Sequence, residues 1–283
     1  MQYCAHALSQ AGIESAHQEA SLLLQHVTDQ SLTTLLCNLQ LPLSPVESAL
    51  LDTYLARRLQ REPLQYILGH AIFRGRRFSV DARVLIPRPE TELLVECVHR
   101  LSAQSICGCD PLHLIDVGTG SGVIAVTLAC EIAGSRTLAL DISREALRVA
   151  QENARRHAVT HQVAFAQGDL VSMIGITTDA VIANLPYVRT DDRSLLAPEI
   201  ANHEPWHALD GGTDGLSVVR RLCEEAPRVL KPGGYLLLEV GAAQAEDVMR
   251  TLWRAERWEH VKSEADLSGI QRVITARLVE SPD

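Results

Sequence analysis

A glycine-rich turn is the first feature of this 283-residue chain with the residue types to bind a ligand. Segment 116–122 reads Asp-Val-Gly-Thr-Gly-Ser-Gly and lies between an apolar run at 112–117 and a predicted helix at 123–130. Glycines close such a turn tightly and let a ligand approach the backbone. The next predicted strand ends at Asp141, 19 residues after Gly122, where a carboxylate can accept hydrogen bonds from ribose hydroxyls. The pattern predicts a nucleotide-type site.

The glycine spacing indicates which nucleotide. In the dinucleotide fingerprint G-x-G-x-x-G the last glycine would stand at Val123, but here it comes one residue early. This spacing suits S-adenosylmethionine, which has no pyrophosphate to place on the helix N-terminus. A third predicted strand leads into Asp169 and Leu170, which are placed to accept from the adenine amino group and to pack on its ring. The predicted cofactor contacts are Gly118, Thr119, Gly120, Ser121, Gly122, Asp141, Asp169, Leu170 and Asn184.

Each of these aspartates taken alone is also compatible with a helix cap. Acidic or glycine-rich ends on three successive strands favour the cofactor site over three independent caps.

A tetrapeptide, Asn184-Leu185-Pro186-Tyr187, follows the fourth predicted strand at 180–183. It resembles the N-P-P-Y motif of methyltransferases that act on planar NH2 groups. The nitrogen lone pair in such a group is delocalised, so the nitrogen is a poor nucleophile. The Asn184 carbonyl and the adjacent backbone carbonyl can hold both N–H groups and direct the lone pair at a sulfonium methyl, while Tyr187 packs on the flat group. Asn184 and Tyr187 are the predicted catalytic residues, and all four residues are predicted to bind the substrate.

The elements that must position these residues alternate along the chain. Strands are predicted at 112–117, 137–140, 163–166, 180–183, 235–240 and 273–276, with helices at 123–130, 146–157 and 218–229 among them. Such alternation is typical of parallel strands joined by helical crossovers in a doubly wound α/β sheet. Ligands bind at the carboxyl ends of such strands, where the turn and the tetrapeptide stand.

The preceding residues read differently. The first seventy are predicted to be helical, with Ser44 as an N-cap before Pro45, and they contain no catalytic constellation, which is typical of a recognition module or a lid. Around Gly75 the segment 72–85 predicts a β-hairpin. The segment contains four arginines, which form either a solvated face of the hairpin or a strip that binds a partner. They are Arg74, Arg76, Arg77 and Arg83.

Composition excludes several classes of protein. A net charge of −9 disfavours nonspecific binding to nucleic acid or to a membrane surface. No apolar run reaches the length of about 20 residues that spans a bilayer. Seven scattered cysteines do not form a disulfide framework, and the first thirty residues, which lack Arg and Lys, do not resemble a secretory or transit segment. We expect a cytoplasmic protein.

Two short sequence patterns resemble metal-binding motifs but lack a feature that such motifs need. Residues 203–207 read His-Glu-Pro-Trp-His, but the zinc motif needs both histidines on one uninterrupted helix, and Pro205 disrupts a helix interior. Cys107-Gly108-Cys109 lacks the spacing of a paired zinc site. We therefore predict no metal.

The whole chain resembles the release factor glutamine methyltransferases from about residue 11 to residue 273. Besides the turn and the tetrapeptide, the matching segments are 63–69 (Pro-Leu-Gln-Tyr-Ile-Leu-Gly), 85–92 (Leu-Ile-Pro-Arg-Pro-Glu-Thr-Glu), 204–205 (Glu-Pro), 208–212 (Ala-Leu-Asp-Gly-Gly), 214–215 (Asp-Gly) and 266–269 (Asp-Leu-Ser-Gly). The resemblance implies an N-terminal helical release-factor-recognition domain (1–70), a β-hairpin linker (71–86) and a class I S-adenosylmethionine-dependent methyltransferase domain (87–283), a Rossmann-like doubly wound sheet.

The resemblance also implies the reaction. It is methyl transfer from S-adenosylmethionine to the side-chain nitrogen N5 of the glutamine in the Gly-Gly-Gln motif of class 1 peptide chain release factors. We expect a monomer that binds neither nucleic acid nor membranes. One residue departs from the family pattern, because Leu185 stands where the family has proline. Asn184 therefore loses the restriction that a following proline imposes, and we expect a less rigid tetrapeptide.

Two other functions stay open on the sequence. A nucleic-acid amino-methyltransferase shares the tetrapeptide and its chemistry, but it needs basic tracks that an acidic chain lacks. A non-catalytic S-adenosylmethionine-binding partner of the release factor is the other, motivated by Leu185.

Overall fold

The computed structural model describes residues 1–38, 42–103 and 111–280. The chain divides into two compact units, one of Met1–His70 with Ala197–His203 and one of Ala71–Leu196 with Glu204–Asp283. The Cys107-Gly108-Cys109 pattern lies outside the described residues. Among the described residues, no helix has the length and apolar character needed to cross a membrane.

The first unit is helical, as the sequence predicts. Its helices are α1 (Gln2–Gln10), α2 (Ala16–Thr28), α3 (Leu32–Cys37), α4 (Pro45–Leu59), α5 (Leu64–Leu68) and α9 (Pro198–His203). Helix α4 begins with Ser44 as its N-cap: the Ser44 hydroxyl accepts from the Glu47 backbone, and the Glu47 carboxylate accepts from the Ser44 backbone. Apolar faces of the helices meet around Leu8 and Leu23, which are fully buried.

Helix α9 joins this unit through ion pairs with the buried Arg58 and with Arg61. Arg58, on α4, contacts Glu19 at 2.6 Å and Glu199 at 2.9 Å, and Arg61 contacts Glu199 at 2.9 Å. The chain thus leaves the second unit after Leu196, contributes one short helix to the first, and returns at Glu204.

The second unit begins at Ala71, within the predicted hairpin of β1 (His70–Phe73) and β2 (Arg76–Ser79), which turns at Gly75 with a φ of 72°. Arg74 and Arg76 both pair with Glu131. Arg83 pairs with Asp81. Because these arginines already pair with carboxylates of the same chain, the structure favours a solvated face over a partner-binding strip for this basic segment.

A seven-stranded sheet forms the rest of the unit, with the order β5-β4-β3-β6-β7-β9-β8. Its strands are β3 (His113–Val117), β4 (Arg136–Asp141), β5 (Val163–Gln167), β6 (Thr178–Asn184), β7 (Leu230–Glu239), β8 (Trp258–Ala265) and β9 (Gln271–Leu278). Strands β3 to β7 are parallel, as predicted, but β9 pairs antiparallel with both β7 and β8. The expectation of parallel strands throughout is therefore wrong at this edge, because only a short turn (266–270) links β8 to β9.

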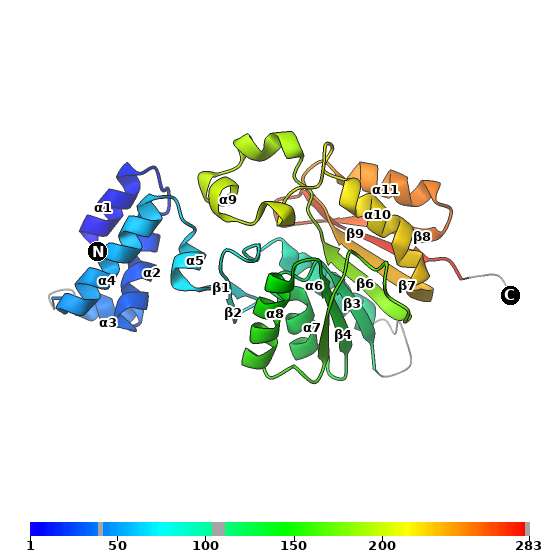
Figure 1. The fold of residues 1–283 in the computed structure, drawn as a ribbon, viewed down its shortest axis with the longest axis horizontal. Coiled ribbons are helices and arrows are strands. Elements are labelled where there is room, and N and C mark those ends of the chain that lie inside the picture. The colour runs from blue at the N-terminus through cyan, green and yellow to red at the C-terminus, as the bar shows by residue number, and fades with distance from the viewer. Residues whose placement is uncertain (39–41, 104–110, 281–283) are drawn as a thin grey trace. The chain divides into compact units, whose positions relative to one another are not determined.

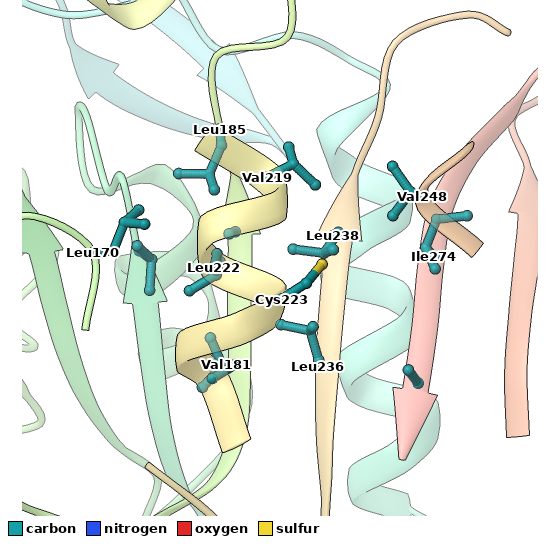
Figure 2. Close-up of a cluster of buried hydrophobic side chains, with 14 of the residues drawn as sticks. Leu170, Val181, Leu185, Val219, Leu222, Cys223, Leu236, Leu238, Val248 and Ile274 are labelled. Carbon is teal, nitrogen blue, oxygen red and sulfur yellow. The ribbon is translucent and has the colours of Figure 1, made fainter. Parts of the chain in front are cut away.

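Helices cover both faces of this sheet (Figure 1). One face packs on α6 (Thr91–Ala103), α7 (Val123–Glu131) and α8 (Arg144–Arg156), and the other on α10 (Ser217–Glu225) and α11 (Ala245–Arg254). Figure 2 shows residues of α10 among side chains of β6 and β7, namely Val219, Leu222, Cys223, Val181, Leu236 and Leu238. Three 3-10 turns, η1 (Thr190–Leu195), η2 (Trp206–Ala208) and η3 (Ala226–Arg228), complete the described elements.

Candidate active site

A cavity of about 270 Å³ opens at the carboxyl ends of β3, β4 and β6. The chain order reverses between β3 and β6, because β4 and β5 lie on one side of β3 while β6 and β7 lie on the other. This is the switch point where α/β sheets bind ligands. Predicted site residues that line the cavity are Gly118, Gly120, Asp141, Asp169, Leu170, Asn184, Leu185 and Pro186.

Some residues of the glycine turn line the cavity, and the others hold the turn in shape from behind. Gly118 and Gly120 line the cavity, and both have positive φ angles, 73° and 55°. Thr119 and Ser121 are buried and do not line it: the Thr119 hydroxyl donates to Asp116 at 2.7 Å. A Cβ on Gly122 would lie 2.9 Å from Ala150 Cβ, so this glycine allows α7 to pack against α8.

Asp141 ends β4 and binds the turn itself. Its Oδ2 accepts from the Gly120 backbone at 2.9 Å, and its Oδ1 accepts from the Ser143 backbone at 2.8 Å. Burial raises the pKa of Asp141, and these two backbone donors oppose the rise. The carboxylate thus holds the turn in shape and keeps lone pairs for a ligand in the cavity.

Asp169 and Leu170 reach the cavity from the loop after β5. Asp169 is about half exposed and pairs with Arg221 at 2.8 Å. Leu170 is buried with a φ of 52°, a left-handed conformation that a branched side chain rarely adopts. Such local strain is typical of functional sites.

The tetrapeptide leaves the end of β6. Asn184 donates through Nδ2 to the Thr91 hydroxyl at 3.1 Å. Leu185 is 4% exposed and packs in the core that Figure 2 shows, where a Cβ on Gly118 would lie 3.2 Å from its Cδ2. The side chain that replaces the family's proline therefore anchors this segment by burial.

Tyr187 does not line the cavity. Its carbonyl accepts from Gln244 Nε2 at 2.9 Å, and burial raises the pKa of its hydroxyl to about 12. Two glycines make room for it: a Cβ on Gly215 would lie 2.4 Å from the Tyr187 carbonyl oxygen, and one on Gly241 would lie 3.1 Å from its ring. This close packing explains why the Asp-Gly pair at 214–215 needs its glycine.

Two buried carboxyls near these residues were not among the predicted site residues. Asp116, fully buried, accepts from Thr119 and the Ala125 backbone, and burial raises its pKa to about 7. Glu239, 2% exposed, ends β7 beside Asn184, and burial raises its pKa to about 7. An acid at the end of an apolar strand is the signal that identified Asp141, and it could have identified both.

The histidine pattern at 203–207 does not form one helix. Helix α9 ends at His203, and Pro205 precedes the turn η2 that contains His207. Glu204 instead accepts from Arg88 at 2.6 Å and from the Ile86 backbone at 3.3 Å. Glu204 thereby holds the segment 85–92, which contains Thr91, in place.

The cavity suits an adenosine-type cofactor. Its wall combines backbone without side chains at Gly118 and Gly120, a carboxylate at Asp141, and apolar side chains at Ile142 and Leu170. Glycine backbone can approach a ligand closely, a carboxylate accepts from ribose hydroxyls, and apolar side chains can cover a flat ring.

Comparisons with known proteins agree with this geometry. Residues 1–69 match the family model of the PrmC N-terminal domain, and residues 110–273 match a methyltransferase domain. The chain is 38% identical to the release factor glutamine methyltransferase of Bacillus cereus over 261 residues, 91% of each chain. It is 38% identical to that of Geobacter sulfurreducens, covering 96% of this chain and 93% of the relative.

Among solved structures, the hMettl16 catalytic domain matches with a TM-score of 0.58 and 14% identity, covering 84% of this chain and 82% of that one. At this identity the likeness shows the fold alone. That fold is the S-adenosylmethionine-dependent methyltransferase fold predicted from the sequence. Identity of this level over nine-tenths of its length places the chain in the release factor glutamine methyltransferase family.

Proposed function

We propose that this enzyme transfers a methyl group from S-adenosylmethionine to the side-chain amide nitrogen N5 of the glutamine in the Gly-Gly-Gln motif of class 1 peptide chain release factors. The observation that carries the proposal is the placement of Asn184, Leu185 and Pro186 in the wall of the cavity that Gly118 and Asp141 also line. An amide-holding group and a cofactor-type cradle share one cavity. Relatives named for this reaction match along nearly the whole chain.

Each end of the cavity has a proposed role. Gly118, Gly120 and Asp141 hold the adenosine part, with Leu170 beside the ring and Asp169 near its edge, and Thr119, Ser121 and Gly122 shape the turn from behind. When bound, the cofactor would supply a methyl group on a sulfonium sulfur, which keeps the electrons of the broken S–C bond and leaves as a neutral thioether. The residues named above hold the cofactor in position, and the tetrapeptide orients the amide nitrogen that accepts the methyl group.

The tetrapeptide prepares the nitrogen. With Nδ2 of Asn184 engaged by Thr91, its Oδ1 is the atom left to accept an N–H of the target amide. The Leu185 backbone carbonyl takes the second N–H. Tyr187 lies outside the cavity wall, with its carbonyl held by Gln244, and would border the flat amide group only once the substrate is bound. Acceptors held in place before the reaction favour the tetrahedral nitrogen of the transition state over the planar amide. Once the new C–N bond forms, the nitrogen loses one of its protons to solvent water.

We also propose that the enzyme acts as a cytoplasmic monomer on a protein substrate, without direct binding to nucleic acid or membranes. The net charge of −9 supports the absence of nucleic-acid and membrane binding, because phosphate-rich surfaces repel an acidic chain. The first unit, which contains no candidate catalytic cluster in its described part, is the proposed recognition unit for the folded factor.

The test combines the full-length protein, labelled S-adenosylmethionine and purified class 1 release factors, with the label located by peptide mass spectrometry. We expect label on the glutamine of Gly-Gly-Gln alone. A factor with that glutamine replaced by glutamate is the control and should stay unlabelled. Label on DNA or RNA instead would support the nucleic-acid reading, and tight cofactor binding with no transfer to any substrate would support the non-catalytic one.

Recognition by the first unit has its own test. A short Gly-Gly-Gln peptide should be a much poorer substrate than the intact factor, measured as kcat/KM. Equal values for the two would contradict a recognition role for this unit.

A further inference from the structure

Glu239 occupies an unusual position for a carboxylate. It is the last residue of β7, in register with Asn184 at the end of β6, and its side chain is 2% exposed. None of the ion pairs among the described residues includes it, and its Oε2 has no hydrogen-bond partner there. A buried carboxylate without a cation costs free energy, so its presence calls for a reason other than stability.

Thr91 connects this carboxylate to the tetrapeptide. It is the first residue of α6, its side chain is 2% exposed, and its hydroxyl accepts from Asn184 Nδ2 at 3.1 Å. Hydrogen bonds from Thr91 and Asn184 lower the pKa of Glu239, although burial, the larger effect, raises it. Both side chains therefore lie near the Glu239 carboxyl, and an ionised carboxylate can only accept from them.

The direction of these hydrogen bonds decides which end of the Asn184 amide faces the cavity. An ionised carboxylate only accepts, so the Thr91 hydroxyl gives its proton to Glu239 and keeps its lone pairs for a donor. The group that then faces Thr91 must be the NH2 of Asn184, and the Asn184 carbonyl is left for the substrate. If Thr91 donated to Asn184 instead, the amide would turn over and present N–H groups to the N–H groups of the target.

We propose that Glu239 is a positioning residue that acts on the Asn184 amide, directly and through the Thr91 hydroxyl, to hold the Asn184 side-chain carbonyl toward the target nitrogen. This rests on the proposed function, because Asn184 needs this orientation only to accept from an amide or amino group. Glu239 itself touches neither substrate nor cofactor in this proposal.

Protonation of Glu239 would reverse the relay, since a carboxylic acid can donate to Thr91. Burial raises its pKa to about 7, Arg272 on β9 lowers it, and Glu90, ahead of α6, raises it. Tyr187 also faces it from the segment after β6. The orientation of Asn184, and with it kcat, should therefore be lost as pH falls through about 7.

The experiment measures single-turnover methyl transfer to saturating release factor across pH 5.5–9. Glu239→Leu should lower the rate about 10–100-fold, the usual loss when a group supporting a functional residue is removed. Thr91→Val should lower the rate by a similar factor, whereas Thr91→Ser, which keeps the hydroxyl, should retain the parental rate. The KM for the release factor should barely change in any of these variants. Glu239→Gln, whose carbonyl can still accept from Thr91, should stay within about tenfold of the parent and lose the acidic limb of the pH profile.

Coupling between the two sites separates this role from simple stabilisation. The double variant Glu239→Leu with Thr91→Val should be no slower than the slower of the two single variants, because both changes break the same network of hydrogen bonds. Glu259→Gln, a carboxyl of β8 in the same sheet, is the matched control and should leave rate and pH profile unchanged.

The proposal would be overturned if the rate loss in the double variant equalled the product of the two single-variant losses. It would also be overturned if Glu239→Leu transferred methyl at the parental rate. An acidic limb that persists in Glu239→Gln would also overturn it and would assign the limb to another group such as Asp116, whose pKa is also raised to about 7. Failure of the parent enzyme to methylate the factor at all would instead refute the proposed function.

Discussion

Buried charges are arranged in opposite ways in the two units. In the first, the buried Glu19 and the part-buried Glu199 converge on the buried Arg58, so that each carboxylate faces a guanidinium. In the second, Asp116, Asp141 and Glu239 are buried at the cavity edge of the sheet, and no ion pair of the described residues includes them. The paired cluster fastens helices together, whereas the unpaired carboxyls accept from backbone, hydroxyl or amide groups.

The same contrast exists within the second unit. Asp179, near the start of β6, is 2% exposed like Glu239, but it pairs with Lys231 at 2.6 Å. Asn184 ends that strand, next to the unpaired Glu239. Buried acids therefore have cations where they serve only the fold and lack them where the sheet meets the cavity, which is the pattern that marks perturbed, functional carboxyls.

The largest effect should come from breaking the paired cluster. Arg58→Met leaves the buried Glu19 without a cation, while Glu199 keeps only Arg61, and loss of one partner from a buried pair costs about 3–5 kcal/mol. We expect early unfolding of the first unit in urea, read by amide hydrogen exchange, with S-adenosylmethionine binding intact. Arg57→Met is the control: Arg57 is 38% exposed and pairs with Glu62, so its loss should cost below about 1 kcal/mol. Equal effects for the two arginines would contradict the role of the buried cluster.

Asn184→Ala should affect the chemical step and leave folding unchanged. Removal of one preorganised polar group lowers kcat about 10²–10³-fold, equivalent to about 2.7–4 kcal/mol, and release factor affinity should barely change. Asn184→Asp keeps an acceptor but places negative charge near the sulfonium, which stabilises the charged ground state more than the transition state. It should fall well short of full activity in single-turnover transfer. A parental rate for Asn184→Ala would exclude the tetrapeptide as the catalytic site.

Asp141→Ala should weaken S-adenosylmethionine binding by roughly 1.5–3 kcal/mol, the scale of a hydrogen bond to a charged group. The side chain also holds the Gly120 and Ser143 backbones, so part of the loss should come from a looser turn. Asp169→Ala is the comparison: its carboxylate is half exposed and paired with Arg221, so the loss should be smaller. Calorimetric titration of each variant measures the difference. Unchanged affinity in Asp141→Ala would contradict the placement of the ribose.

Much of this organisation was predictable because it is local in sequence. The strand ends at Asp141 and Asn184, the hairpin and the cap at Ser44 follow from short-range patterns. The strand β8 was not predicted, since its side chains are mostly polar and part-exposed. The contact from Asn184 to Thr91 joins residues 93 positions apart, and Glu239 lies farther still along the chain. Their meeting depends on sheet order, which no local pattern encodes.

Leu185→Pro should have the smallest effect and the most informative one. Proline restores the family residue and stiffens the unfolded chain, which is worth about 0.4–1 kcal/mol. It also removes part of a side chain that is 4% exposed, at about 0.8 kcal/mol for each buried CH2 lost. These terms oppose each other, so stability should change by no more than about 1 kcal/mol, with kcat within a few-fold of the parent.

Leu185→Ala separates the two terms, because it loses the buried atoms without gaining stiffness and should destabilise the protein by about 2–5 kcal/mol. Thermal unfolding and single-turnover transfer on the two variants make the comparison. If alanine and proline behave alike, burial alone holds the tetrapeptide and the stiffness of the chain there is irrelevant. If proline raises kcat well beyond a few-fold, Leu185 leaves Asn184 less well oriented than its packed position indicates.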